Sequence, residues 1–538
     1  MKPQHLRLRA LRRQLEIEEA RLRGRALGAV ALIVAVGAGA AFVVHHPARA
    51  TAPAPFVAGE RVGLTGVSPE AVPRGAGSFL LTVTGTGFGP DAAVHWNGQR
   101  RPTQVLSSTR LAASIGAADI DGAGPHAVTV VTGGVPSGGT LRVATYERAM
   151  HDGSADRVLG QPGFDSRVAY HPAVGGDREG VVNAAGFDRL GPQGVAIDPA
   201  SGRLFVAETR GARVLSWPSA RAFHNAESAD LVLGQPDESS AGPKEPDART
   251  MCSPQAVAVD PQGSLYVSDD CHHRVLRFDP PFATGMGAAA VFGQDGSFTS
   301  AASNKGGRSA RSLSHPGGLV AGAQGLFVHD GGNRRVLHFR KPRESAVADV
   351  AIGQADLASF EAGPPSARRL ASEDGALALD PKGALLVADT MGNRVLRFSP
   401  PFANGMAADV VLGQKDFAQT GRSSFADGLW RPAALAFDAE GNLLVAESGN
   451  HRVVRYASPL ASGMSANGLL GQAGFGLARA GAGASRLASP SGLAIDGAGD
   501  VIVADGGNAR VLAFDRPFAP APDPRVARGT GREASRGR

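Results

Sequence analysis

Residues 376–398 read ALALDPKGALLVADTMGNRVLRF, and the chain repeats this pattern six times. Each copy has an apolar run, a turn, a second apolar run that ends at an acidic residue, and a third run that begins with Arg. Short apolar runs separated by turn residues are typical of antiparallel strands. The copies occupy residues 194–217, 256–278, 318–339, 376–398, 434–456 and 492–514.

A nearly constant spacing relates the copies. Their acidic residues recur at intervals of 58 to 61 residues, and a fourth short run ends in Leu-Gly-Gln or a variant of it. Four antiparallel strands repeated at one period predict a β-propeller. One Leu-Gly-Gln precedes the first repeat and none follows the last, so we expect Arg157–Gln161 to supply the outer strand of the last blade. Closing the ring in this way removes the open sheet edges.

The repeats resemble the NHL family, most closely in GNHRVVRY at 449–456. Six repeats closed in this way give six blades, and the resemblance implies that they form an NHL-type β-propeller over residues 150–518. The preceding segment, residues 62–145, shows period-two alternation between turns and reads as a small antiparallel sandwich. It resembles the immunoglobulin-like IPT/TIG family in VSPEAVPRG (67–75), LTVTGTGFG (81–89), VHWNG (94–98), SSTRLAASI (107–115) and GPHAVTVVT (124–132). That resemblance implies an Ig-like spacer or protein-contact module without catalysis, so the fold class is all-β.

Composition excludes several classes of protein. Charged residues make up 19% and aromatic residues 6% of 538 residues, which disfavours disorder, and two cysteines exclude a disulfide-dense scaffold or a Cys₄ zinc site. The net charge of +6 lies at the two ends: residues 1–25 hold eight Lys or Arg against three Glu, and the Arg-rich tail 519–538, which we expect to be disordered, holds five Arg against two acids. The 493 residues between them sum to −2. A nucleic-acid partner is therefore disfavoured.

The N-terminal region reads as a membrane anchor. A basic segment (1–25) precedes an uncharged apolar run within 26–45, which is long enough for one transmembrane helix or signal anchor. The positive-inside rule places the N-terminus in the cytoplasm and the bulk of the chain in the periplasm or outside the cell, after a Pro/Ala linker (46–61). The chain would then be a single-pass protein of the inner membrane in a bacterial envelope. The alternative is a secreted protein, because Ala48-Arg49-Ala50 forms a signal-cleavage pattern near Ala50.

An acidic residue and an Arg lie five residues apart in all six repeats. These pairs could be six ion or ligand sites, or structural turn pairs in which the carboxylate binds turn N–H groups and the Arg. Identical placement in every blade favours the structural interpretation. The pairs are Glu208 and Arg213, Asp269 and Arg274, Asp330 and Arg335, Asp389 and Arg394, Glu447 and Arg452, and Asp505 and Arg510.

Residues that open the first strand of each repeat should face the central channel or its mouth. They are Gln193, Gln255, Gly317, Asp374, Ala433 and Ser491. Gln193, Gln255 and Asp374 are candidate ligand-binding residues, although the set has a single carboxylate and no His. This composition is poor for a metal or for catalysis, so we predict no catalytic residues, no bound metal and no cofactor.

The two cysteines fall in the second repeat. Cys252 precedes its first strand and Cys271 lies in the turn between its second and third strands, loops that share one face of a propeller. We therefore expect a Cys252–Cys271 disulfide in an oxidising compartment. Cys271-His272-His273 could instead be part of a metal cluster, but other repeats carry ordinary turn residues there.

These features favour a non-catalytic, membrane-anchored scaffold whose propeller face binds a protein, peptide or cell-surface glycan. The alternative is an extracytoplasmic hydrolase or lyase, similar to propeller lactonases, with its site at the channel mouth near Asp374 and Gln193. RNA binding, known for some NHL propellers, is disfavoured by the charge and by the expected location.

Overall fold

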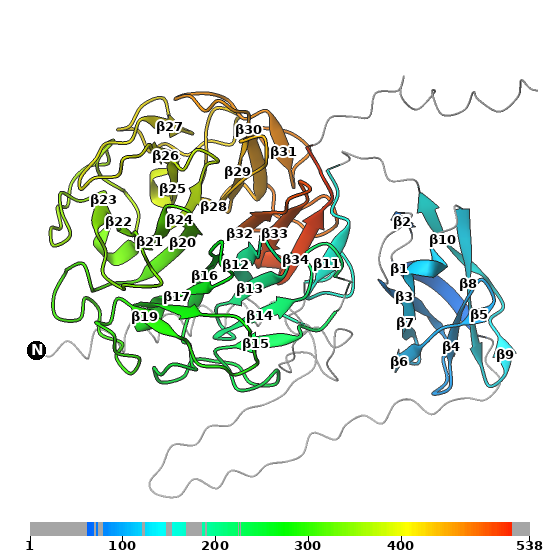
Figure 1. The fold of residues 1–538 in the computed structure, drawn as a ribbon. Helices are drawn as coiled ribbons and strands as arrows, with labels where there is room; N and C mark the ends of the chain where they lie inside the picture. Colours follow the sequence, from blue (N-terminus) through cyan, green and yellow to red (C-terminus); the bar gives the residue numbers. More distant parts are fainter. Residues whose placement is uncertain are drawn as a thin grey trace, which may run out of the picture. The chain divides into compact units, whose positions relative to one another are not determined.

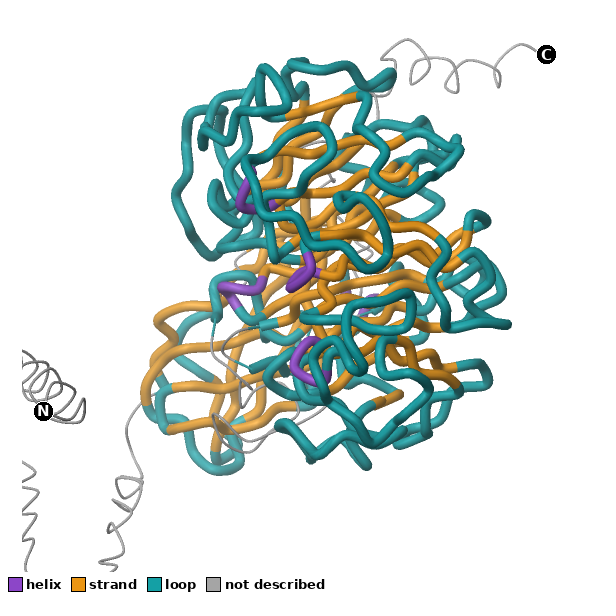
Figure 2. The backbone as a smooth tube through the Cα atoms, turned by 90° about the vertical axis from the view of Figure 1, so that its left-hand side faces the viewer, coloured by secondary structure: helices purple, strands orange, loops and turns teal. Residues whose placement is uncertain are grey.

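The computed structural model describes residues 62–68, 71–73, 79–120, 124–146, 153–167, 186–188, 191–223, 225 and 227–518. The predicted basic segment, membrane helix and linker (1–61) and the C-terminal tail (519–538) lie outside the described residues, as does the cleavage pattern near Ala50. Among the residues described, no helix is long and apolar enough to cross a membrane. Strands supply nearly all the regular structure, as Figure 2 shows, and the helices are single 3₁₀ turns.

The first folded part consists of two sheets built by residues 63–146 (Figure 1). One sheet has the order β1 (Gly63–Ser68), β3 (Phe79–Thr86), β7 (Arg110–Ile115) and β6 (Thr103–Ser107). The other sheet has the order β2 (Ala71–Pro73), β10 (Leu141–Tyr146), β8 (Gly124–Thr132), β4 (Ala93–Trp96) and β5 (Gln99–Arg100), and β9 (Val135–Pro136) also pairs with β8. A 3₁₀ turn, η1 (Ala117–Asp119), precedes β8 in the sequence.

One core joins these two sheets. Along β3 the side chains alternate between buried and more exposed positions. Leu81 and Val83 of β3 pack in a common cluster with Trp96, Val128 and Val130 of the second sheet. The buried Trp96 ring lies edge-on to Phe79, with 6.0 Å between the ring centroids. The period-two alternation predicted from the sequence is thus the inward and outward alternation of a two-sheet core.

The second folded part is a β-propeller of antiparallel four-stranded sheets, six in the described residues. We number the sheets 1 to 6 by the repeat that supplies their first three strands. The first strands are β12 (Pro192–Ile197), β16 (Pro254–Val259), β20 (Pro316–Gly322), β24 (Gly375–Leu379), β28 (Pro432–Phe437) and β32 (Gly492–Ile495). The second strands are β13 (Leu204–Glu208), β17 (Leu265–Asp269), β21 (Gly325–Asp330), β25 (Leu385–Asp389), β29 (Leu443–Glu447) and β33 (Val501–Asp505).

The outer half of each sheet follows the same order. The third strands are β14 (Arg213–Trp217), β18 (Arg274–Phe278), β22 (Arg335–Phe339), β26 (Arg394–Phe398), β30 (Arg452–Tyr456) and β34 (Arg510–Phe514). The fourth strands are β15 (Leu231–Leu233), β19 (Ala290–Phe292), β23 (Val350–Ile352), β27 (Val410–Leu412), β31 (Gly468–Leu470) and β11 (Arg157–Leu159). In sheets 2, 3, 4 and 6 a 3₁₀ turn joins strands two and three: η2 (Asp270–His272), η3 (Gly331–Asn333), η4 (Thr390–Gly392) and η5 (Gly506–Asn508).

The ring closes as predicted. β11 precedes the first repeat in sequence but pairs with β34 of the last, with Val158 opposite Leu512. Each first strand contacts the first strands of both neighbouring sheets, including β12 with β32 (Figure 1). One core cluster joins Ile502 and Val511 of sheet 6 to Leu204 and Leu215 of sheet 1.

Burial differs between strand positions. The first strands are only partly buried, whereas all six second strands are buried at every residue. The second and third strands are covered by neighbouring sheets on both faces, as between Phe327 and Leu385. The first strands line a central cavity, and this opening leaves them partly exposed.

Candidate functional site

The six carboxylate–Arg pairs are buried ion pairs. In each pair the Arg Nε contacts the carboxylate, and both side chains are 0% exposed. The N···O distances are 2.6 Å (Glu208–Arg213), 3.0 Å (Asp269–Arg274), 2.7 Å (Asp330–Arg335), 2.8 Å (Asp389–Arg394), 2.5 Å (Glu447–Arg452) and 2.7 Å (Asp505–Arg510). A freely diffusing ligand cannot reach these groups.

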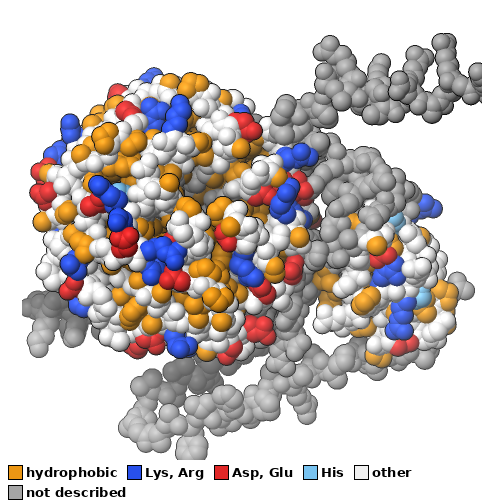
Figure 3. Space-filling model, in the orientation of Figure 1, with side chains coloured by type: hydrophobic (Ala, Val, Ile, Leu, Met, Phe, Trp, Pro, Cys, Tyr) orange, Lys and Arg blue, Asp and Glu red, His pale blue; other side chains and the backbone are white. Residues whose placement is uncertain are grey.

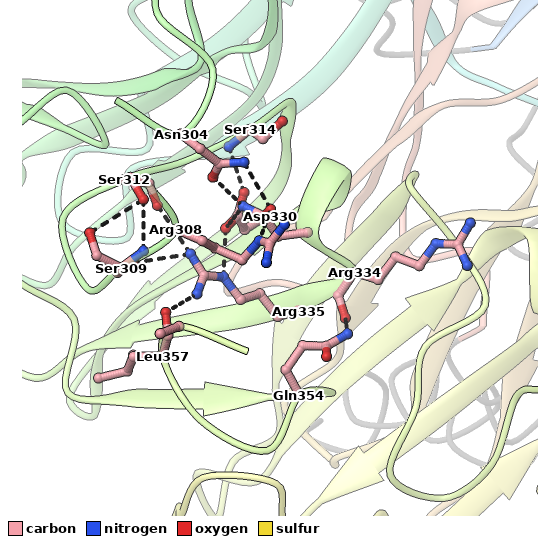
Figure 4. A network of polar contacts seen from close by, with 12 residues as sticks. Asn304, Arg308, Ser309, Ser312, Ser314, Asp330, Arg334, Arg335, Gln354 and Leu357 are labelled. Carbon is pink, nitrogen blue, oxygen red and sulfur yellow. Dashed lines mark hydrogen bonds and ion pairs between the residues drawn. The ribbon is translucent and has the colours of Figure 1, made fainter. Parts of the chain in front are cut away.

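Each pair also ties loops together, as Figure 4 shows for sheet 3. Arg335 donates to the carbonyls of Ser309 and Ser312 at 3.1 and 3.2 Å, and also to Leu357. Asp330 accepts the Ser314 backbone N–H at 2.7 Å. The guanidinium therefore satisfies carbonyls of the loop before strand one, and the carboxylate binds the chain as it enters that strand. These contacts are architectural.

Burial raises the pKa of the carboxyl groups of Asp330, Asp389, Glu447 and Asp505, and the neighbouring Arg offsets this only in part. Asp269 differs. Burial raises its pKa too, but the hydrogen bond from His272 and the charge of Arg274 outweigh burial, so the pKa lies below its usual value. His272 thus makes the carboxylate of sheet 2 unlike those of sheets 3 to 6.

The Leu-Gly-Gln ending has a structural role that its sequence did not reveal. The Gln side-chain amide donates to the carbonyl of the left-handed residue that precedes strand three, for example Gln414 to Asn393 at 2.8 Å. The Gly before it has φ between +79° and +93° in all six copies. A Cβ on Gly413 would lie 2.6 Å from the Leu429 side chain. The repeated motif therefore anchors strand four to the turn beside it.

A cavity of about 680 Å³ opens where the first strands begin. It is lined by all six predicted positions: Gln193, Gln255, Gly317, Asp374, Ala433 and Ser491. Asp374, however, does not hold the same place as Gln193. Leu377 pairs with Val387 as Val195 pairs with Val206, so Gly375 is the true counterpart and Asp374 precedes the strand. The first and fourth copies begin at residues 194 and 376, so the residue that precedes the copy is Gln193 in the first and Gly375 in the fourth, and Asp374 was assigned one residue too early.

Ionisable side chains that the sequence did not single out also line this cavity. They are Asp270, His315, Glu373 and Arg431. His315 Nδ1 lies 3.1 Å from the Asp270 carboxylate, and Glu373 lies 3.7 Å from Arg334. Burial raises the pKa of Asp270, and the charge of His315 opposes that rise. Within the described part of the chain, the side chains of Asp374 and Arg431 form no ion pair.

Contacts across the sheet junctions order this rim. A left-handed turn residue accepts, through its side chain, the backbone N–H of the residue that leads into the next sheet. The three contacts are His273 Nδ1 with His315 at 3.1 Å, Asn393 Oδ1 with Arg431 at 2.9 Å, and His451 Nδ1 with Ser489 at 2.9 Å. Burial lowers the pKa of both His273 and His451, and His315 and His272 lower that of His273 further.

One buried histidine lies directly behind the cavity wall. His329 of β21 is fully buried, and neither ring nitrogen has a hydrogen-bond partner among the residues described. Burial lowers its pKa to about 4. Its Nε2 lies 2.7 Å from where a Cβ on Gly375 would stand, so the ring fills space that a side chain at 375 would need.

The structure joins Cys252 and Cys271 in a disulfide, with 5.9 Å between their Cα atoms. The disulfide links the loop before β16 to η2. The two neighbouring histidines have separate contacts: His272 Nδ1 lies 2.7 Å from Asp269 Oδ2, and His273 bonds to the next sheet. Other repeats carry ordinary turn residues at these positions, but in sheet 2 both histidines have defined hydrogen-bond partners.

Comparison with known proteins supports the repeat assignment. The NHL repeat family matches residues 251–278, 429–456 and 487–514. The chain therefore carries NHL repeats, and they lie in its β-propeller. No curated protein matches the sequence at a significant level.

Several solved structures resemble the chain at low identity. An auxiliary nutrient binding protein from Bacteroides thetaiotaomicron is 10% identical with a TM-score of 0.38, and the match covers 85% of this chain and 98% of that one. A streptogramin B lyase is 12% identical with a TM-score of 0.35, covering 62% and 94%. A virginiamycin B lyase from Staphylococcus aureus is 13% identical with a TM-score of 0.34, covering 61% and 96%.

Proposed function

We propose that the chain is a non-catalytic scaffold that binds a protein, peptide or cell-surface glycan partner across the mouth of the propeller cavity. The observation that carries this proposal is the pair of unmatched charges on the rim. Asp374 and Arg431 are exposed, line the cavity, and belong to neighbouring sheets 4 and 5. A partner with one positive and one negative group would pair with both, which favours a protein or peptide over a neutral glycan.

Architecture supports a binding role for the rim. The groups that repeat in every sheet are buried and hold the sheets together, so they are not available to a partner. The groups that differ between sheets, including Asp270, His315 and Glu373, lie at the cavity. Binding sites commonly occupy varied loops on a rigid scaffold.

We take the six sheets as the blades of one six-bladed NHL-type propeller and residues 62–145 as an IPT/TIG-like Ig sandwich that serves as a spacer. We further propose that residues 26–45 anchor the chain in the inner membrane, with the N-terminus inside and the folded parts outside. The alternative is secretion after cleavage near Ala50. In either case the partner would be met outside the cytoplasm.

Surface charge supports a partner other than nucleic acid. Figure 3 shows that, on the face of the propeller in view, basic and acidic side chains are interspersed rather than gathered into separate basic and acidic areas. A surface that binds a phosphate backbone needs clustered positive charge.

One observation favours the second candidate, a lactonase-like hydrolase or lyase. The Asp270 carboxylate lies against His315 Nδ1, and His315 lines the cavity. A carboxylate that orients an imidazole is the arrangement of a general base. Asp374 and Gln193 would then contact substrate. Incubation with ester and lactone substrates distinguishes the candidates, because only the enzyme would show turnover that His315→Ala abolishes.

The scaffold proposal is tested by capturing partners on the immobilised full chain and mapping the contact by hydrogen exchange. We expect protection on binding at the loops that carry His315, Asp374 and Arg431. Protection confined to the turns at the opposite end of the sheets, such as that at Lys382, would refute the proposed site.

A further inference from the structure

The repeated framework holds the two cysteines of sheet 2 together independently of their bond. Asp269 Oδ1 accepts the backbone N–H groups of Cys252 and Ser253, both at 2.9 Å. Corresponding contacts without cysteines occur in other sheets, such as Asp389 with Ala371 at 2.9 Å and Asp330 with Ser314 at 2.7 Å. The loop with Cys252 and the turn with Cys271 therefore have a reason to remain adjacent when the disulfide is reduced.

His272 replaces an asparagine that serves the same carboxylate elsewhere. Asn333, Asn450 and Asn508 each donate to the acidic residue three positions earlier, at 2.8, 2.6 and 2.7 Å. The buried His272 makes this contact through Nδ1, at 2.7 Å from Asp269. When the Nδ1–H of an imidazole is hydrogen-bonded to a carboxylate, Nε2 carries a lone pair that can bind a metal. An asparagine at this position has no such nitrogen. This is how metal-binding histidines are commonly oriented.

These residues form a compact cluster of three metal-ligating types. One potential ligand atom from each of Cys252, Cys271 and His272 lies within 4.8 Å of the others. Tetrahedral coordination at roughly 2.0 to 2.3 Å from a metal places the ligand atoms about 3.3 to 3.8 Å apart. The two sulfurs, bonded to each other in the disulfide, must therefore separate on reduction, while His272 already lies near both. We propose that sheet 2 holds a redox-gated site for a thiophilic divalent cation such as Zn²⁺, formed by Cys252, Cys271 and His272 when the disulfide is reduced.

The two states exclude each other. Two equivalents of a thiol reductant cleave the Cys252–Cys271 bond, giving two cysteine thiols and the oxidised reductant. The cation then binds both sulfurs as thiolates and His272 Nε2, and the two thiol protons pass to solvent. A fourth position stays open to water, since the cluster supplies three ligands. In the disulfide state the sulfurs are bonded to each other and do not coordinate as thiolates.

The test uses the full chain and Co²⁺ as a spectroscopic probe for this site. Protein is reduced with a phosphine, the two free thiols are counted, and Co²⁺ is titrated while thiolate-to-cobalt charge-transfer absorption is followed. We expect one equivalent to bind the reduced chain and none of this absorption in the oxidised chain. Cys252→Ser should abolish the tight site.

His272→Asn separates a metal ligand from a structural histidine, because asparagine at this place keeps the bond to the carboxylate in sheets 3, 5 and 6. We expect it to weaken Co²⁺ binding by about tenfold or more. His273→Asn, next to the cluster, should leave affinity unchanged. The proposal is overturned if the reduced chain gives no thiolate band, if His272→Asn binds as tightly as the wild type, or if reduction alone unfolds the propeller by circular dichroism.

Discussion

Replacing Arg394 with methionine isolates the contribution of one buried ion pair. Arg394 Nε lies 2.8 Å from Asp389, both side chains are fully buried, and the guanidinium also donates to the carbonyls of Arg369 and Ser366 at 2.9 and 3.3 Å. The substitution leaves a carboxylate buried without its cation. Breaking such a pair costs about 3–5 kcal/mol of unfolding free energy.

The matched control lies three residues along the same strand. Arg397 pairs with Asp409 at 2.8 Å, but their side chains are 25% and 40% exposed. Arg397→Met should therefore cost only about 0.2–1 kcal/mol. Both variants are measured by denaturant unfolding followed by circular dichroism.

The pH dependence gives an independent check. Burial already raises the pKa of Asp389 in the wild type, and loss of Arg394 raises it further. A carboxyl with a raised folded-state pKa favours folding when protonated, and this contribution is lost as pH rises through that pKa. The penalty in Arg394→Met should therefore shrink as pH falls from 7 towards 4. If Arg394→Met lowers the free energy of unfolding no more than Arg397→Met does, or by an amount that does not depend on pH, the structural role given to the repeated pairs is refuted.

Three further predictions concern backbone and histidines. Gly413→Ala should destabilise the propeller by about 1–3 kcal/mol, because φ is +79° and Leu429 lies against the new Cβ, whereas Gly421→Ala, with open space around it, should be near neutral in the same unfolding assay. His273 and His451 have lowered pKa values in the folded state, so their contribution to folding stability is present above the unfolded value near 6.5 and is lost as pH falls. The variant with Asn at both positions should therefore lose stability less steeply between pH 7 and 5. An unchanged dependence of stability on pH would contradict these contacts. His329→Phe removes a buried imidazole whose pKa is about 4 and whose ring nitrogens have no hydrogen-bond partner among the residues described. Thermal melts should therefore show that the variant is more stable than the wild type by an amount that grows as pH falls from 6.5 to 4. A variant that is less stable at every pH would refute this description of His329.

Much of the fold could be predicted from the repeat alone. In the fourth repeat, the second apolar run, which ends at the acidic residue Asp389, forms the strand β25, because apolar runs bounded by turn residues define buried strands. The strand that closes the ring could be identified by counting the Leu-Gly-Gln endings. In the sandwich, β3 shows the period-two alternation that the sequence predicts.

The rim of the cavity could be predicted only in part. The six predicted positions do line it, but Asp374 was assigned one residue too early, because Gly375 directly precedes the fourth copy and opens β24. His315 and Asp270 come from different sheets, so their contact depends on how sheets pack rather than on local pattern. The departure of His272 from the asparagine found in three other repeats is visible in the sequence, although its significance depends on the Asp269 contact.

The most direct test of a binding site at the cavity mouth is the affinity of a captured partner for rim charge variants of the full chain. We predict that Asp374→Lys and Arg431→Glu each weaken binding by about tenfold or more, since each reverses an exposed charge at the cavity. Lys382→Glu reverses an exposed charge in the turn between the first two strands of the same sheet as Asp374, at the opposite end, and should leave affinity unchanged. Equal affinity for all three variants, or a loss confined to Lys382→Glu, would contradict a binding site at the cavity mouth.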